Sequence, residues 1–382
     1  MWRDQCLTFR RVPFGITCSP YMLLRTISCH VQKYTSVYPE LMQRVESSLY
    51  MDDLCPTFSS QEEAISGMEI ITEVFSGAKM ELHKSRMTGT VSNEDSSVLG
   101  LLWRTETDDL AVTVPEIARP CTRRDLLSAV AKPFDPLGLL TPWLVRGKRL
   151  FQRSWTDPQL EWDDRLPPEL QRDVDAWWHE AAVKLVWFPR SAVITLAGEC
   201  DEPPEFHVFC DASRDAYCAA VYVLQGGEAR LLIAKSRLAP VKPTLTIPRL
   251  ELMAAVTGCR LMRFVSESLN LSDPKVQYWT DALDVLCWIT GKRVLRVFVQ
   301  NRVTSVLQMS SPSQWRHVHG EHNPADLGTR GVFLAVLDRC DMWWVGPEFL
   351  RRPATLPQCC PRLESCRLRQ SWRLRTRSRA DV

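Results

Sequence analysis

The pattern of apolar and polar positions is clearest between residues 201 and 331, where it alternates between two periods. Short apolar runs bounded by turn residues predict strands, whereas apolar positions three or four residues apart predict helices. Strands are expected at 206–213, 216–225, 229–238, 276–281 and 314–320, and helices at about 248–270, from Ala282 and at about 297–309. This order predicts a mixed sheet with helices packed on it.

Residues 1–103 mix short apolar runs with helical stretches. Ser19-Pro20 marks a helix start, and a second, capped helix is expected from Ser59 or Ser60 to Gly77. Between them, residues 47–58 read as a strand, a tight turn and a strand, with Asp52-Asp53 at the tip. Short strands are also expected at 79–89 and 97–106.

Residues 104–200 change to a helical pattern that is interrupted by proline and glycine. Two helices separated near Pro133 and Gly138 are followed by another from about Pro167, which predicts a helical connection region. Beyond residue 331 the proportions of proline and arginine increase and the hydrophobic periodicity weakens. Residues 332–382 are therefore interpreted as a largely disordered tail. The chain is therefore divided into 1–103, 104–200, 201–331 and 332–382.

Composition narrows the class of protein only a little. A hydrophobic content of 45% and a charged content of 24% are ordinary for a globular protein. The net charge of +2 does not indicate nucleic-acid binding, although the arginine-rich tail could hold phosphates or be a solvated end. The 14 cysteines include no Cys-x-x-Cys pair, so a zinc site is not supported. Neither a signal peptide nor a membrane-length apolar run is present, which predicts an intracellular, cytoplasmic protein that is neither secreted nor membrane-bound.

Four carboxylates lie where strands end or helices begin. Asp211 and Asp281 end predicted strands, Glu251 lies at the start of a long helix, and Asp326 follows a turn. Each alone could be a helix cap or a turn residue. Together they can converge at one edge of a sheet, where their repulsion requires cations. Hard oxygen ligands favour Mg²⁺ or Mn²⁺, and two such ions can promote phosphodiester hydrolysis.

These four positions resemble the ribonuclease H domain of retroelements, in which Asp, Glu, Asp and Asp occur in this order. The phrases IPRLELMAA, DPLGLLTPW, WRHVHGEHNPADLGTRG and WWVGPEFL resemble the pol polyprotein of Pao/BEL-type long-terminal-repeat retrotransposons. The resemblance covers about residues 1–350 and suggests a middle piece of such a polyprotein. It implies a metal-dependent endonuclease that acts on the RNA strand of an RNA–DNA hybrid.

The resemblance also implies a role for each acidic residue. Asp211 would bridge two ions, Glu251 and Asp281 would hold one of them and help place the scissile phosphate, and Asp326 would complete the other. A histidine near the last aspartate often assists product release in this family. His322 is the expected candidate and His319 the second, although a loop histidine without a role fits either position equally well.

The first hundred residues resemble the palm of a reverse transcriptase, an RNA-directed DNA polymerase. The resemblance is carried by Pro13-Phe14-Gly15, by Tyr50-Met51-Asp52-Asp53 at the predicted hairpin, and by a lysine-bearing segment before Leu99-Gly100. It implies Asp52 and Asp53 in a metal site. Near a template-primer, it would place five further contacts: Tyr50 and Met51 by the primer end, Phe14 and Gly15 by the nucleotide, and Lys84 by its phosphates.

Part of the polymerase pattern has no counterpart in this sequence. The other metal-binding aspartate and the fingers domain of the polymerase are not matched in this sequence. Asp4 does not replace that aspartate, because its neighbours suit a surface hairpin rather than the catalytic strand. DNA synthesis by this chain alone is therefore not expected. The expected fold class is α/β, with an α+β palm remnant and a ribonuclease H-like mixed sheet flanked by helices. The alternatives are an inactive nucleic-acid-binding remnant and a non-functional pol fragment, and other pol fragments could be partners.

Overall fold

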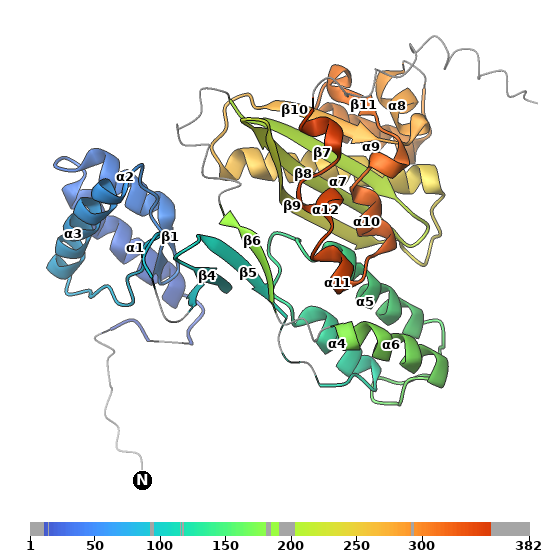
Figure 1. Ribbon diagram of the computed structural model, residues 1–382, viewed down its shortest axis with the longest axis horizontal. Helices are drawn as coiled ribbons and strands as arrows, with labels where there is room; N and C mark the ends of the chain where they lie inside the picture. The colour runs from blue at the N-terminus through green and yellow to red at the C-terminus, as the bar shows by residue number, and fades with distance from the viewer. Residues whose placement is uncertain are drawn as a thin grey trace, which may run out of the picture. The chain divides into compact units, whose positions relative to one another are not determined.

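The computed structural model describes residues 11–13, 15–91, 95–114, 116, 118–180, 185–190, 203–291 and 294–352 (Figure 1). The chain divides into two compact units, Met1–Thr107 and Asp108–Val382, and each is described by itself. The expected connection region and ribonuclease H-like region thus fall almost wholly within the second unit.

The first unit is mainly helical. Its elements are α1 (Ser19–Val31), η1 (Gln32–Tyr34), α2 (Pro39–Ser48), β1 (Leu49–Tyr50), β2 (Asp53–Leu54), α3 (Gln61–Gly77), β3 (Ser96–Val98) and β4 (Leu101–Arg104). Helix α3 begins as expected, because the Ser60 side chain accepts a hydrogen bond from the Glu63 amide. The apolar faces of the three α-helices form one core, whose buried members are Ile27, Val31, Met42, Val45, Ile71, Val74 and Phe75.

The strand expected at 79–89 is not formed. Lys79 and Lys84 adopt the left-handed backbone conformation, with φ of 57° and 58°, which interrupts an extended chain. Met80 and Leu82 instead pack against the helical core from an irregular segment. Packing against the helical core therefore determines the conformation of this segment, although its local sequence pattern predicts a strand.

The second unit contains a connection part and a five-stranded sheet. Its elements are β5 (Asp109–Thr113), α4 (Arg123–Ala131), α5 (Thr141–Ser154), α6 (Pro168–Glu180), β6 (Leu185–Pro189), β7 (Glu205–Ala212), β8 (Ala216–Gln225), β9 (Glu228–Leu238), α7 (Ile247–Ser268), β10 (Lys275–Thr280), α8 (Leu283–Thr290), α9 (Val297–Leu307), η4 (Pro312–Gln314), β11 (Trp315–His317), η5 (Gly320–His322), α10 (Ala325–Arg330), α11 (Leu334–Leu337), α12 (Asp341–Trp344) and η6 (Glu348–Leu350). The five-stranded sheet has the order β11-β10-β7-β8-β9, in which β10 runs parallel to β7 and β11 and the other neighbours are antiparallel.

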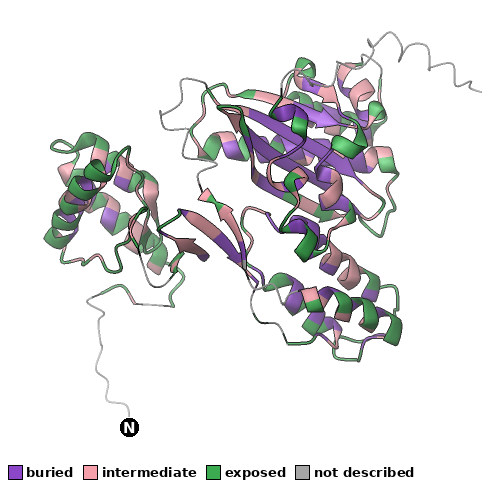
Figure 2. Ribbon diagram, viewed as in Figure 1, coloured by how far each residue is buried: buried purple, intermediate pink, exposed green. Residues whose placement is uncertain are grey.

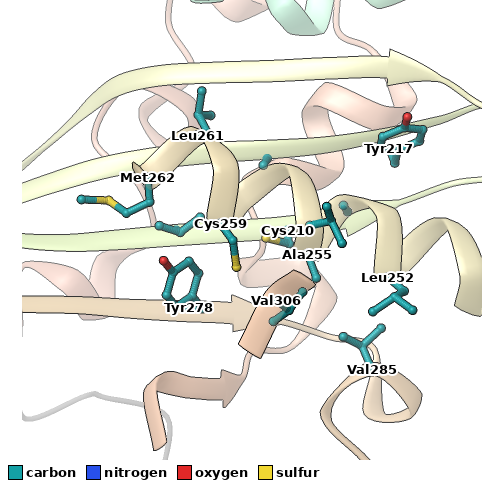
Figure 3. Packing of buried hydrophobic residues seen from close by; sticks show 14 of the residues in the cluster. Cys210, Tyr217, Leu252, Ala255, Cys259, Leu261, Met262, Tyr278, Val285 and Val306 are labelled. Carbon is teal, nitrogen blue, oxygen red and sulfur yellow. The ribbon is translucent and has the colours of Figure 1, made fainter. Parts of the chain in front are cut away.

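Helices cover both faces of this sheet, which is why its central strands are apolar along almost their whole length (Figure 2). Helix α7 packs on one face, where a Cβ atom at Gly258 would lie 2.6 Å from the Cys210 sulfur. Figure 3 shows this layer, with Cys210 and Cys259 between helix and sheet. Helix α10 packs on the opposite face, where a Cβ atom at Gly328 would lie 2.3 Å from the Cys218 sulfur. Glycine at these two positions permits the close approach.

The connection part is helical, as the sequence predicts. Helix α4 begins with a capping box between Thr122 and Asp125. Helices α5 and α6 pack through stacked Trp143 and Trp177, whose ring centroids are 5.0 Å apart. Trp177 is a core residue, whereas Trp155 is half exposed.

The loop between α4 and α5 lies along the outer strand β9. The Ala234 amide donates a 2.8 Å hydrogen bond to the Leu137 carbonyl. A Cβ atom at the next residue, Gly138, would lie only 1.9 Å from the Ala234 carbonyl oxygen. The connection part is therefore packed directly against the edge of the sheet.

Residues 332–352, which the sequence assigns to a disordered tail, contain α11, α12 and η6. The Trp343 side chain is fully buried, and its indole N–H donates a 2.8 Å hydrogen bond to the Leu139 carbonyl. Phe349 stacks at an angle against Trp279 of β10. This segment therefore completes the cover of the sheet face that α10 occupies. The remaining residues of the expected tail lie outside the described residues.

The architecture confirms the expected fold class, a helical and sheet-containing α/β chain with a ribonuclease H-like mixed sheet. Within the described ranges, no helix has the length and apolar character needed to cross a membrane.

Candidate metal centre

The pairing of β7 with β10 brings Asp211 and Asp281 together. In this parallel pair Thr280 lies opposite Cys210, so each aspartate is the next residue at the same edge of the sheet. Side chains alternate along a strand, and Cys210 faces α7. Asp211 therefore faces the side on which α10 packs.

Glu251 reaches the same edge from the other face of the sheet. It lies in the first turns of α7, a helix with Pro248 near its start and a wide buried face. Gly258, two turns later, fixes that helix close to Val208 and Cys210 of β7. The Glu251 side chain is consequently almost fully buried, with 7% exposed.

The three carboxylates form one compact group. One oxygen atom from each of Asp211, Glu251 and Asp281 lies within 4.8 Å of the others. In this group Glu251 Oε2 and Asp281 Oδ1 are buried and have no hydrogen-bond partner among the described residues. An unpaired buried carboxylate is costly, and a cation removes that cost. The donor set, all oxygen and all acidic, fits a hard divalent cation.

The raised pKa values of these three carboxyl groups show that ionising them at this buried site is unfavourable. Burial, together with the neighbouring negative charges, raises the pKa of Asp211 to about 7 and that of Glu251 to about 9. The pKa of Asp281 is also raised, mainly by burial. Without a cation the group therefore holds protons near neutral pH, and a bound cation would displace them.

Asp326 lies beside this group but outside the 4.8 Å cluster. Its Oδ1 atom accepts a 2.6 Å charge-assisted hydrogen bond from Arg330 Nε, four residues later in α10. Its negative charge still contributes to the raised pKa values of Asp211, Glu251 and Asp281. The structure thus brings three of the four predicted acids together and places the fourth within their electrostatic reach.

Three further residues shape the centre and were not predicted from sequence. Thr329 Oγ1 donates a 2.7 Å hydrogen bond to Asp211 Oδ2, and Asn323 Nδ2 donates a 3.0 Å hydrogen bond to the Cys210 carbonyl. A Cβ atom at Gly320 would lie 3.2 Å from Asp281 Oδ2. All three lie within the segment GEHNPADLGTRG. The partners of Thr329 and Asn323 are more than a hundred residues away, and neither these two polar side chains nor a glycine indicates its partner from sequence alone.

The histidines near the last acid differ in their surroundings. His322 has a half-exposed side chain whose Nε2 lies 3.6 Å from Glu321 Oε1. His319 contacts the His317 ring edge-to-face, with centroids 5.4 Å apart. His317 interacts electrostatically with Asp281, although burial still lowers the pKa of His317. The role expected for His322 remains a prediction.

The residues of the polymerase motif lie in the first unit. Tyr50 pairs with Asp53 across the β1–β2 hairpin, and Met51 at its tip has a φ of 53°. Tyr50, Met51, Asp52 and Asp53 are exposed. Gly15 and Lys84 are also exposed, whereas Phe14 lies outside the described residues. The hairpin is formed as expected, but its tip is Met51-Asp52 rather than the predicted Asp52-Asp53, because Asp53 pairs with Tyr50 as the first residue of β2.

The sheet order and the acids at the ends of its central parallel strands define a ribonuclease H-like domain. Residues 122–282 match the family model described as the Pao retrotransposon-like RNaseH-like domain. The expected relation to retrotransposon pol proteins is confirmed, and the match extends into the connection helices.

Solved structures of foamy virus proteins are also similar. The foamy viral protease-reverse transcriptase with RNA/DNA hybrid is 12% identical, with a TM-score of 0.46 over 81% of this chain and 39% of that chain. The same enzyme with dsDNA is 14% identical, with a TM-score of 0.44 over 80% of this chain and 59% of that chain. This chain therefore spans less than two thirds of either chain. No curated protein matches it.

Proposed function

We propose that the second unit is a metal-dependent endonuclease that cuts the RNA strand of RNA–DNA hybrids, with Mg²⁺ or Mn²⁺ as its cofactor. The observation that carries this proposal is the convergence of Asp211, Glu251 and Asp281, with two buried carboxylate oxygens left unpaired. Among the residues that the structure describes, this is the only such group of three metal-ligating side chains. The ribonuclease H-like family of residues 122–282 supports RNA as the strand that is cut.

The residues of the centre have distinct proposed roles. Asp211 would hold both ions, Glu251 and Asp281 would hold one of them, and Asp326 would complete the other. Divalent ions in such a site activate a water molecule and stabilise the leaving oxygen of a phosphodiester. Glu251 and Asp281 would also orient the 2′-hydroxyl beside the scissile phosphate. Selection of RNA would depend on that hydroxyl and on the shape of the hybrid. His322 would assist product release.

Substitution of Asp281 tests the proposal. Asp281→Asn should lower cleavage of a labelled RNA–DNA hybrid in Mg²⁺ by at least about 100-fold, the scale on which loss of electrostatic transition-state stabilisation acts. The fold should remain, because the substitution removes one of several repelling charges. Asp284→Asn is the matched control, since Asp284 is an exposed acid three residues later on α8.

Equal cleavage by wild type and Asp281→Asn would contradict the proposal. Hybrid binding with a steep salt dependence, but no cutting even in Mn²⁺, would instead select an inactive nucleic-acid-binding remnant. No binding and no cutting would select a non-functional pol fragment.

For the first unit we propose a remnant of a polymerase palm. The exposed hairpin with Asp52 and Asp53 would face a template-primer, with Tyr50, Met51, Phe14, Gly15 and Lys84 as the remaining contacts. No part in RNA cleavage is assigned to these residues.

A further inference from the structure

The Thr329 side chain contacts Asp211 directly. Thr329 is fully buried on α10, and its hydroxyl lies 2.7 Å from Asp211 Oδ2 and 3.0 Å from the Asp326 carbonyl oxygen. A hydroxyl has one proton and can donate to one acceptor at a time. An ionised carboxylate is the stronger acceptor and is also the nearer one here, so the proton is directed to Asp211.

The backbone around Thr329 is itself held against β7. The Thr329 carbonyl lies 3.3 Å from Ser213 Oγ, two residues beyond Asp211, and shares this donor with the Ala216 carbonyl at the same distance. On the other side of Asp211, the Cys210 carbonyl accepts the 3.0 Å hydrogen bond from Asn323, a buried residue just before α10. Helix α10 is thus attached to β7 on both sides of the acid, and the position of the Thr329 hydroxyl is fixed.

We propose that Thr329 is a positioning residue for the metal centre, which rests on the proposed metal-dependent function. Its hydroxyl holds Asp211 Oδ2 and leaves Oδ1 directed to the cation. Threonine suits this task because branching at Cβ restricts rotation of its side chain. The same helix turn carries Asp326, so Thr329 also fixes the spacing between the first and the last acid of the centre.

The matched variants Thr329→Ser and Thr329→Ala test this role, because both lack the methyl group and they differ only in the hydroxyl. Binding of Mn²⁺ to the purified full chain is measured by titration calorimetry. Thr329→Ala should bind Mn²⁺ about 10- to 100-fold more weakly than wild type, the range found when a partner of a metal ligand is removed. Thr329→Ser should bind close to wild type. Thr105→Val is the control, since it removes a buried hydroxyl that donates 2.7 Å to the Thr90 carbonyl outside the centre.

The outcomes separate this proposal from the proposed function. Equal Mn²⁺ affinity of the Ser and Ala variants overturns the role of Thr329 and leaves the nuclease untouched. Metal binding by wild type without cleavage of the hybrid overturns the nuclease alone, while the affinity difference still supports Thr329. Absence of metal binding by wild type overturns both.

Discussion

His207 shows how strongly the sheet controls a single ionisable side chain. It is buried on β7, and its Nδ1 atom accepts a 3.1 Å hydrogen bond from the Trp279 indole N–H. That bond requires an unprotonated Nδ1, and Nε2 has no hydrogen-bond partner among the described residues. Burial is the main reason why the pKa of His207 falls to about 4.

This lowered pKa predicts a loss of stability in acid. Between about pH 6.5 and about pH 4 the unfolded chain binds a proton at His207 and the folded chain does not, so stability falls as the pH falls through this window. At about pH 5 the loss from this residue is about 2 kcal/mol. His207→Gln should lose correspondingly less stability between about pH 7 and about pH 5, as measured by urea unfolding. Parallel losses in wild type and variant would contradict the prediction.

Some site residues could be predicted from sequence and others could not. Asp211 and Asp281 were recognisable because each ends an apolar run, and the carboxyl ends of strands gather at one edge of a sheet. Thr329 was not, because its partner is 118 positions away and a buried threonine has no sequence pattern of its own. Gly320 was missed for a similar reason, since only the packed structure shows how closely it approaches Asp281.

Helix α10 packs against the sheet through one very close contact. Gly328 of this helix faces Cys218 of β8, where a Cβ atom would lie 2.3 Å from the sulfur. Gly328→Ala should therefore destabilise the second unit by about 1–3 kcal/mol, the usual cost of overpacking a core. It should also weaken Mg²⁺ binding, because α10 carries Asp326 and Thr329. Thermal unfolding with and without Mg²⁺ measures both effects.

A second substitution provides the control for this prediction. Adding Cys218→Ala removes the sulfur, so the double variant Gly328→Ala, Cys218→Ala should regain most of what Gly328→Ala loses, and Cys218→Ala alone gives the baseline. Additive losses in the double variant would show that the contact does not limit the position of α10.

The longer elements of the second unit were predictable because each contains several repeats of its apolar pattern. Helix α7 and strands β7, β8 and β9 match the expected positions to within about two residues. Helices α11 and α12 have four residues each, which is too short to show a helical period. Trp343 of α12 and Phe349 of the following η6 are buried against partners in distant parts of the chain, which a local pattern does not reveal.

For the molecule as a whole, the connection part should stabilise the folded sheet of the second unit. The Leu137, Leu139 and Ala239 carbonyls all accept hydrogen bonds of 2.8 Å that link this part to the sheet and its cover. Three such bonds contribute about 3 kcal/mol at about 1 kcal/mol each. A fragment of residues 203–352 should therefore unfold at a lower urea concentration than one of residues 108–352. Equal midpoints would show that the sheet region is independent.

The segment over β9 has one more consequence, for the behaviour of many copies in solution. β9 is an outer strand, and an outer strand offers free amides and carbonyls to any extended chain that meets it. The Leu137 carbonyl accepts a hydrogen bond from the Ala234 amide, and the close approach of Gly138 to this strand leaves no room for a larger residue. Loosening this loop would leave the fold recognisable yet give neighbouring molecules a template for joining sheet to sheet, so Gly138 also protects the protein from aggregation.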